Sequence, residues 1–178
     1  MKHSTKHILL AALCLAIAFI LPTLTGMAIN KVWSPMHIAI FICAYVTDRK
    51  LGALTGFIAP IARGLLFGMP PLFPTAIAMA FELATYGYIC GLLNVKLPKS
   101  NKNIYISLIT AMIIGRIVWG LISWVLYTLM GNPFTWKIFI AGALLNAWPG
   151  IVLQIIVIPV LIMALRKAKV IDHGHSHN

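Results

Sequence analysis

Residues 73–93 read FPTAIAMAFELATYGYICGLL, and this stretch decides the fold. Its length of about 20 largely apolar residues is what a helix needs to cross the hydrocarbon core of a bilayer. Glu82 stands in the middle of it and is the only one of the chain's 3 acidic residues inside an apolar segment. A carboxylate at that depth is costly unless it has a partner or a function. The stretch therefore predicts a transmembrane helix that carries a polar site.

The rest of the chain is similarly apolar. Of its 178 residues, 61% are hydrophobic and 10% are charged, and the mean hydropathy is +0.95. Soluble domains carry about 25% charged residues, so this composition excludes a soluble globular protein. At about 20 residues for each crossing, the chain has room for one bundle and almost none for a soluble domain. We expect a single transmembrane domain over residues 1–178, with any ATPase on another chain.

The basic residues predict how the bundle is oriented. Most of them fall in alternate loops or at the two ends: Lys2, Lys6, Arg49, Lys50, Lys96, Lys99, Lys102, Arg166, Lys167 and Lys169. The opposite side carries Lys31 and Lys137. Because cytoplasmic loops are enriched in Lys and Arg, this asymmetry predicts cytoplasmic N- and C-termini and an even number of crossings. The net charge of +11 then suits anionic lipid, and we expect no nucleic-acid partner.

The expected fold class is an all-α integral membrane protein with a six-transmembrane-helix bundle. The expected helices cover residues 7–21, 35–47, 51–67, 74–93, 104–130 and 136–165, and a cytoplasmic basic and His-rich tail covers 166–178. Residues 22–33 are expected to form an outer loop that acts as a lid. Segment 35–47 is short for a crossing, at roughly 20 Å, and is either tilted or partly re-entrant. Trp148, Pro149 and Pro159 predict an irregular, kinked backbone in the last helix.

Polar residues on three of these helices are expected at matching depths. Glu82 and Asn146 each lie about nine or ten residues from the outer end of their helices. Arg116 lies near the midplane, where snorkelling is difficult, so it should face protein or water. These positions predict one outward-facing cavity for a small polar molecule. Its expected lining is Glu82, Tyr86, Arg116, Trp119, Ser123 and Asn146, with Trp33 and His37 in the covering segments.

Two alternatives stay open for the charged residues. The intramembrane charges form either a binding site or an ion pair that only fixes helix packing. Arg63, about one turn from the outer end of its helix, either joins the pocket or extends to the interface.

Motifs for catalysis or metal binding are not evident. The sequence has no HExxH, no GxSxG with a distant histidine, no paired carboxylates in the membrane and no P-loop, so we expect neither an enzyme nor a catalytic residue. The cysteines Cys14, Cys43 and Cys90 are single core residues without CxxC spacing. The alternating histidines His173, His175 and His177 are expected to have only adventitious metal affinity. We predict no metal site and no cofactor.

Three motifs give a resemblance to a known family. The runs SPMHI (residues 34–38), GMPPLFPTAIAMAFELATYG (68–87) and GRIVWG (115–120) resemble the substrate-binding S components of energy-coupling factor (ECF) vitamin transporters. The similarity covers essentially the whole chain, including six crossings and small size. It implies a multi-pass protein of the prokaryotic plasma membrane whose outer half binds a vitamin or related micronutrient with high affinity.

The resemblance also implies partners. Family members dock through an alanine-xxx-alanine motif on their first helix to a transmembrane coupling subunit that works with two ABC-type ATPases. Ala12 and Ala16 match that motif. Small residues four apart allow close helix approach in lipid, although the same face would also suit packing inside the bundle.

The ligand and one competing function stay open at this stage. Pantothenate would use Arg116 for its carboxylate, whereas a queuosine precursor or the pyrimidine of thiamine would use Glu82 and the aromatic rings. The competing function is a self-contained secondary transporter in which Glu82 takes up a proton. No inverted repeat is evident in the sequence, which weighs against many such carriers.

Overall fold

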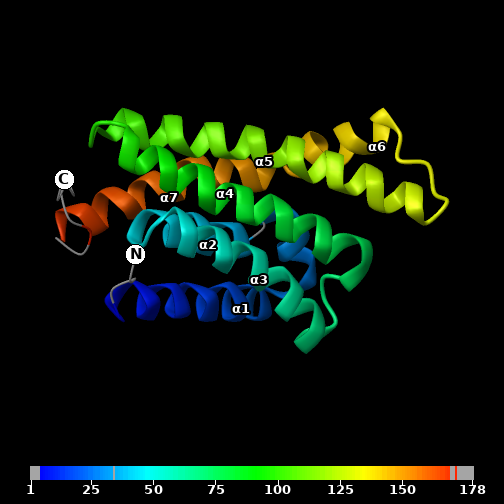
Figure 1. Ribbon diagram of the computed structural model, residues 1–178, viewed down its shortest axis with the longest axis horizontal. Coiled ribbons are helices and arrows are strands. Elements are labelled where there is room, and N and C mark those ends of the chain that lie inside the picture. The colour runs from blue at the N-terminus through cyan, green and yellow to red at the C-terminus, as the bar shows by residue number, and fades with distance from the viewer. Residues whose placement is uncertain (1–4, 34, 169–170, 172–178) are drawn as a thin grey trace.

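The computed structural model describes residues 5–33, 35–168 and 171, although not the side chains of 25–33 and 144. Within these residues every regular element is a helix (Figure 1). The elements in chain order are α1 (Thr5–Trp33), α2 (Pro35–Val46), α3 (Arg49–Phe67), η1 (Leu72–Ala76), α4 (Ile77–Lys96), α5 (Asn101–Leu129), α6 (Trp136–Ile140), η2 (Ala141–Leu145) and α7 (Trp148–Lys167). The predicted all-α membrane bundle is confirmed.

Among the described residues, 5 helical segments are long and apolar enough to cross a membrane. They are Thr5–Leu24, Arg49–Phe67, Leu72–Lys96, Asn101–Leu129 and Trp136–Lys167. α2 has only 12 residues and rises about 18 Å. The start of α1 and the end of α7 lie at the same end of the bundle (Figure 1). This agrees with an even number of crossings, while the cytoplasmic position of that end stays a prediction.

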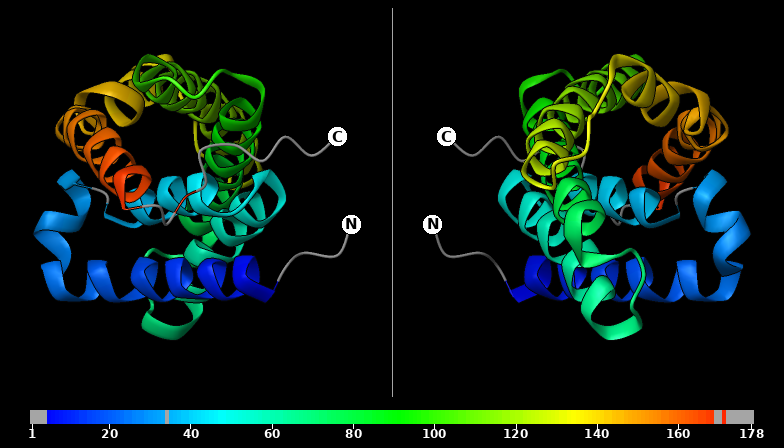
Figure 2. Two further views of the ribbon diagram at one scale, coloured as in Figure 1. Left: turned by 90° about the vertical axis from the view of Figure 1, so that its left-hand side faces the viewer. Right: turned by 90° about the vertical axis from the view of Figure 1, so that its right-hand side faces the viewer.

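The short helix α2 forms the centre of the bundle. All of its residues except Ile42 and Val46 are buried. It packs against α1, α3, α4 and α7, and Figure 2 shows it between α1 on one side and α5 on the other. A helix that is apolar on all sides belongs in a protein interior. The segment predicted to be short is therefore an interior helix, enclosed by the other helices of the bundle.

The course of α1 differs from the prediction. The expected helix 7–21 continues to Trp33, so the lid expected over 22–33 is helical, with Pro22 inside the helix. Figure 2 shows the last part of the ribbon turning away from the first. Proline removes a backbone donor and kinks a helix, but Thr side chains and neighbouring helices supply other donors. Here the Phe19 carbonyl accepts hydrogen bonds from Thr23 Oγ1 at 2.8 Å and Arg63 Nη1 at 2.9 Å.

The helices α3 and α4 form a closely packed pair that positions Glu82. Asp48 caps the start of α3 through hydrogen bonds from the backbone N–H groups of Lys50 and Leu51. A Cβ atom on Gly56 would collide with the backbone of Leu83, so α3 lies directly against the α4 backbone next to Glu82. Small residues of this kind are a main source of helix association in lipid.

The last segment is broken, as the sequence around Trp148 predicted. α6 and η2 are followed by a turn at Asn146 and Ala147, and Pro149 lies in the first turn of α7. Pro149 suits that position because the first N–H groups of a helix have no intrahelical partner. The expected helix 136–165 is thus divided into α6, η2 and α7, and the break changes which residues of this segment face inward.

Candidate functional site

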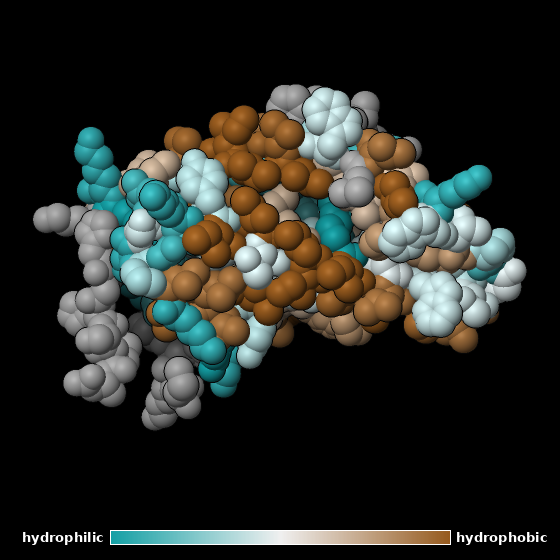
Figure 3. Space-filling view, turned by 90° about the horizontal axis from the view of Figure 1, so that it is seen from above, coloured by the Kyte–Doolittle hydropathy of each residue, from teal (hydrophilic) through white to brown (hydrophobic). Residues whose placement is uncertain are grey.

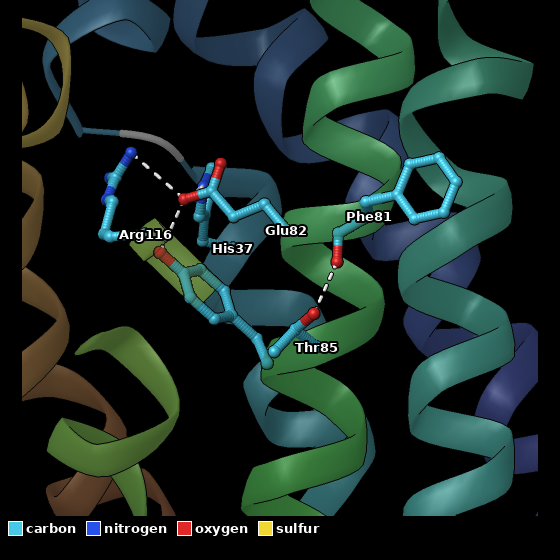
Figure 4. A network of polar contacts seen from close by, with 6 residues as sticks. His37, Phe81, Glu82, Thr85 and Arg116 are labelled. Atoms are coloured by element: carbon cyan, nitrogen blue, oxygen red, sulfur yellow. Dashed lines mark hydrogen bonds and ion pairs between the residues drawn. The ribbon is translucent and has the colours of Figure 1, made fainter. Parts of the chain in front are cut away.

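The carboxylate of Glu82 is the centre of a buried polar cluster. Glu82 is 1% exposed, and its Oε1 atom accepts a hydrogen bond from Tyr86 Oη at 2.6 Å. Arg116 Nη1 on α5 lies 3.0 Å from the same oxygen (Figure 4). Charge-assisted contacts at these distances are roughly twice as strong as neutral hydrogen bonds. The predicted meeting of Glu82, Tyr86 and Arg116 is present in the structure.

Tyr86 joins three helices at this cluster. It follows Glu82 by one turn of α4, and its ring stacks on that of Phe41 from α2, with 4.8 Å between ring centroids. Gly115 of α5 faces the same ring, and a Cβ atom at Gly115 would overlap it. Glycine is therefore needed here for the aromatic side chain to pass between the helices. Neither Phe41 nor Gly115 was among the predicted site residues, although Phe41 lies one helical turn after His37.

His37 of α2 lies beside the cluster without completing it. Its Nε2 atom is 3.9 Å from Glu82 Oε1, too far for a hydrogen bond, and its ring centroid is 5.6 Å from that of Tyr86. His37 is 4% exposed, yet neither of its ring nitrogens has a hydrogen-bond partner among the described residues. A buried polar group without a partner costs about 1 to 3 kcal/mol. A polar molecule beside His37 would supply the missing hydrogen bonds.

The cluster is more accessible on the side of Arg116. The Arg116 side chain is 18% exposed, against 2% for Glu82. Figure 3, seen from the side of α5 and α7, shows an apolar surface with a hollow that has hydrophilic residues at its bottom. A cavity of about 340 Å³ lies nearby between α5 and α6, but its lining is almost entirely apolar and does not include Glu82 or Arg116.

The other predicted site residues occupy different places. Trp119 packs against Gly142 of η2 and lies 6.3 Å from Phe139, measured between ring centroids, in an aromatic group at the α5–α6 end. Ser123 is buried at 2% exposure, about two turns from Arg116. The side chain of Trp33 lies outside the described part of the chain.

Asn146 does not join the buried cluster. It is exposed in the turn after η2 and forms no side-chain hydrogen bond with Glu82 or Arg116. The expectation that its amide meets the two charges assumed an unbroken helix from Trp136. The π-helical turn and the break before α7 alter the rotation of the chain, so a depth counted along a straight helix does not give the side-chain direction.

Arg63 contacts α1 and does not join the pocket around Glu82. It is buried, its Nη1 atom donates to Phe19 O and to Thr23 Oγ1 at 3.0 Å, and its guanidinium lies over the Phe67 ring. It thus holds α3 against α1 near Pro22. Its role in the described contacts is structural, and it does not enter the cluster around Glu82.

The docking motif expected on α1 faces outward. Ala12 and Ala16 are both exposed, whereas Ala11, Cys14 and Ala18 on the other side of the helix are buried. The alternative in which this alanine pair packs inside the bundle is therefore not what the structure shows. The two alanines lie on the outer surface of α1 beside the exposed side chains of Leu9 and Leu13.

Comparison with known protein families identifies the chain. The family described as "ECF transporter, substrate-specific component" matches residues 6–162, from the start of α1 nearly to the end of α7. The chain belongs to this family. Comparison with the curated proteins and with the solved structures found no match. An ECF substrate-specific component is a transporter subunit and a multi-pass membrane protein, which agrees with the apolar helices described above. Within the described residues no group of His, Cys, Asp and Glu is arranged to hold a metal ion.

Proposed function

We propose that this S component binds a vitamin or related micronutrient precursor at the cluster formed by α2, α4 and α5, and delivers it to the cell interior in the prokaryotic plasma membrane. Uptake is energised by a transmembrane coupling subunit and two ABC-type ATPases. The single observation that carries the proposal is the buried ion pair of Glu82 and Arg116 beside His37, which has no hydrogen-bond partner within the described part of the chain.

The groups around the pair define the chemistry of the ligand. One Nη atom of Arg116 contacts Glu82, and a guanidinium has five N–H donors, so most of its donors remain for a ligand. His37 adds a further donor or acceptor. The charges of Glu82 and Arg116 compensate each other, so the site suits a small molecule rich in acceptor groups, with a heterocycle favoured by the neighbouring aromatic rings. Pantothenate, a queuosine precursor and the pyrimidine of thiamine are the candidates to compare.

The test is mass spectrometry of small molecules that co-purify with the protein from the producing cells. We expect one vitamin-like compound at a stoichiometry near that of the protein, lost on substitution of Arg116. Recovery of only lipids and detergent, together with no binding of the three candidate ligands by calorimetry, would contradict the proposal.

The secondary-transporter alternative is less well supported. Glu82 is already engaged by Arg116 and Tyr86, so it is not a free proton acceptor. The two functions are separated by reconstituting the isolated chain in liposomes. Solute uptake driven by a pH gradient without ATP would favour the carrier, whereas uptake only after addition of the coupling subunit and ATPases supports the S component.

Replacement of His37 is expected to weaken ligand binding without lowering the stability of the fold. His37→Leu removes a buried polar group without a partner, so the free energy of unfolding should stay equal or rise by about 1 kcal/mol. Ligand affinity should fall about tenfold if a ligand hydrogen bond is lost. Thermal unfolding with and without ligand measures both quantities. A variant that loses stability and keeps its affinity would place His37 among the packing residues.

A further inference from the structure

A second polar cluster lies at the end of the bundle where α4 and α7 end and α5 begins (Figure 1). A cavity of about 340 Å³ at this end is lined by Lys99, Asn101, Met163, Arg166 and Lys167. Three of these five residues are cations and none is acidic. The cluster lies at the end predicted to be cytoplasmic and is separate from the site around Glu82.

Arg166 lacks a counterion in the described structure. It is 9% exposed, and its Nη2 atom donates a long hydrogen bond of 3.4 Å to Asn94 Oδ1. Within the described residues no ion pair joins Arg166 to a carboxylate. A buried guanidinium without a compensating charge is strongly destabilising. The surroundings of Arg166 therefore call for an anion.

Lys99 brings a second positive charge to the same acceptor. Its Nζ atom donates to the Asn94 backbone O at 2.6 Å and to Asn94 Oδ1 at 3.4 Å, so both cations share one amide oxygen. Partial burial, together with the neighbouring charge of Arg166, lowers the pKa of Lys99. Two like charges held this close repel unless an anion lies between or beside them.

One of the three helix ends at this cavity, the start of α5, adds a positive contribution, whereas the C-terminal ends of α4 and α7 carry a partial negative charge. Asn101, which lines the cavity, is the first residue of α5, and Ser100 makes no side-chain capping hydrogen bond. The N-terminal end of a helix carries a partial positive charge and N–H groups that favour anions. The helix terminus thus supplements the cations of Lys99 and Arg166.

We propose that this cavity binds the phosphate group of an anionic phospholipid headgroup. A lipid is favoured over a soluble phosphate because the cavity lies at the end of two spans, where headgroups are found, and Met163 forms an apolar part of its wall. Val160 and Leu161 are exposed on α7 one to two turns deeper and offer an apolar surface to the acyl chains. Basic pockets between helices on the cytoplasmic side are known to hold such headgroups.

Native mass spectrometry of the purified protein, exchanged into equal amounts of phosphatidylglycerol and phosphatidylcholine, tests the proposal. The wild-type protein should retain phosphatidylglycerol preferentially. Arg166→Gln and Lys99→Gln should each retain about tenfold less of it, because each removes a charge-assisted contact. Lys102→Gln is the matched control, since Lys102 is an exposed lysine in the same first turn of α5 that does not line the cavity.

Each contrary result has a definite meaning. If Lys102→Gln loses as much phosphatidylglycerol as the cavity variants, the lipid is held by the overall positive charge of this surface and not by the cavity. That result would overturn the proposal. Binding of inorganic phosphate without preference between the two lipids would assign the cavity to a soluble anion and also overturn it. If Arg166→Gln fails to fold, Lys99→Gln still decides the question, because Lys99 is exposed and its replacement leaves no buried group newly unpaired.

Discussion

Replacing Arg116 with methionine is expected to lower the free energy of unfolding by about 3 to 5 kcal/mol. The substitution leaves the Glu82 carboxylate, which is 1% exposed, without the cation that lies 3.0 Å away. The remaining hydrogen bond from Tyr86 does not offset the cost of a buried charge. Thermal unfolding of the purified variant in detergent measures the effect.

A second variant distinguishes a binding role from a packing role. Glu82→Gln combined with Arg116→Met removes both charges and should recover most of the stability, since a buried ion pair contributes little compared with well-packed neutral groups. Ligand affinity should stay about 1.5 to 3 kcal/mol weaker in the double variant, because the charge-assisted contact to the ligand is still missing. Recovery of affinity together with stability would mean that the pair serves helix packing alone.

Replacing Ala12 or Ala16 with tryptophan is expected to abolish uptake in cells that contain the coupling subunit and the ATPases. Both alanines are exposed on α1, and a bulky indole there would hold the coupling subunit away from the helix. Ligand affinity of the purified protein should change by no more than about twofold, since surface substitutions usually change stability by less than 0.5 kcal/mol. Uptake of radiolabelled ligand and calorimetry provide the two measurements.

Ile113→Trp is the control for this experiment. Ile113 is 57% exposed on α5, which lies on the other side of the bundle from α1 (Figure 1). The same bulky group in a different lipid-facing position should leave uptake intact. Loss of ligand binding in the Ala12 or Ala16 variants would show that α1 is needed for the fold instead of for docking.

The membrane crossings and the pairing of Glu82 with Arg116 were predictable because they depend on the hydrophobicity of each segment and on the high cost of an unpaired charge in it. A carboxylate in an apolar span needs a partner, and few charged residues are available inside the spans of this chain. Tyr86 follows Glu82 by one helical turn, so their contact also follows from local geometry. Local geometry also places Ala12 and Ala16 on one face of their helix, because they are four residues apart.

The parts that sequence reasoning missed depend on tertiary contacts. The helix expected to end at Leu21 continues past Pro22, where Arg63 on α3 donates to the Phe19 carbonyl. Asn146 was placed by counting along a straight helix, which the π-helical turn interrupts. Phe41 stacks on Tyr86 from a different helix, and no local pattern in α2 indicates that partner.

The shortness and burial of α2 have a consequence for biosynthesis. A helix of 12 residues does not match a hydrocarbon layer about 30 Å thick, so it is a poor substrate for independent insertion by the translocon. We therefore expect α2 to enter the membrane together with helices that enclose it. The order in which the nascent chain leaves the ribosome then matters, because α2 acquires its full surroundings only after α7 has been made.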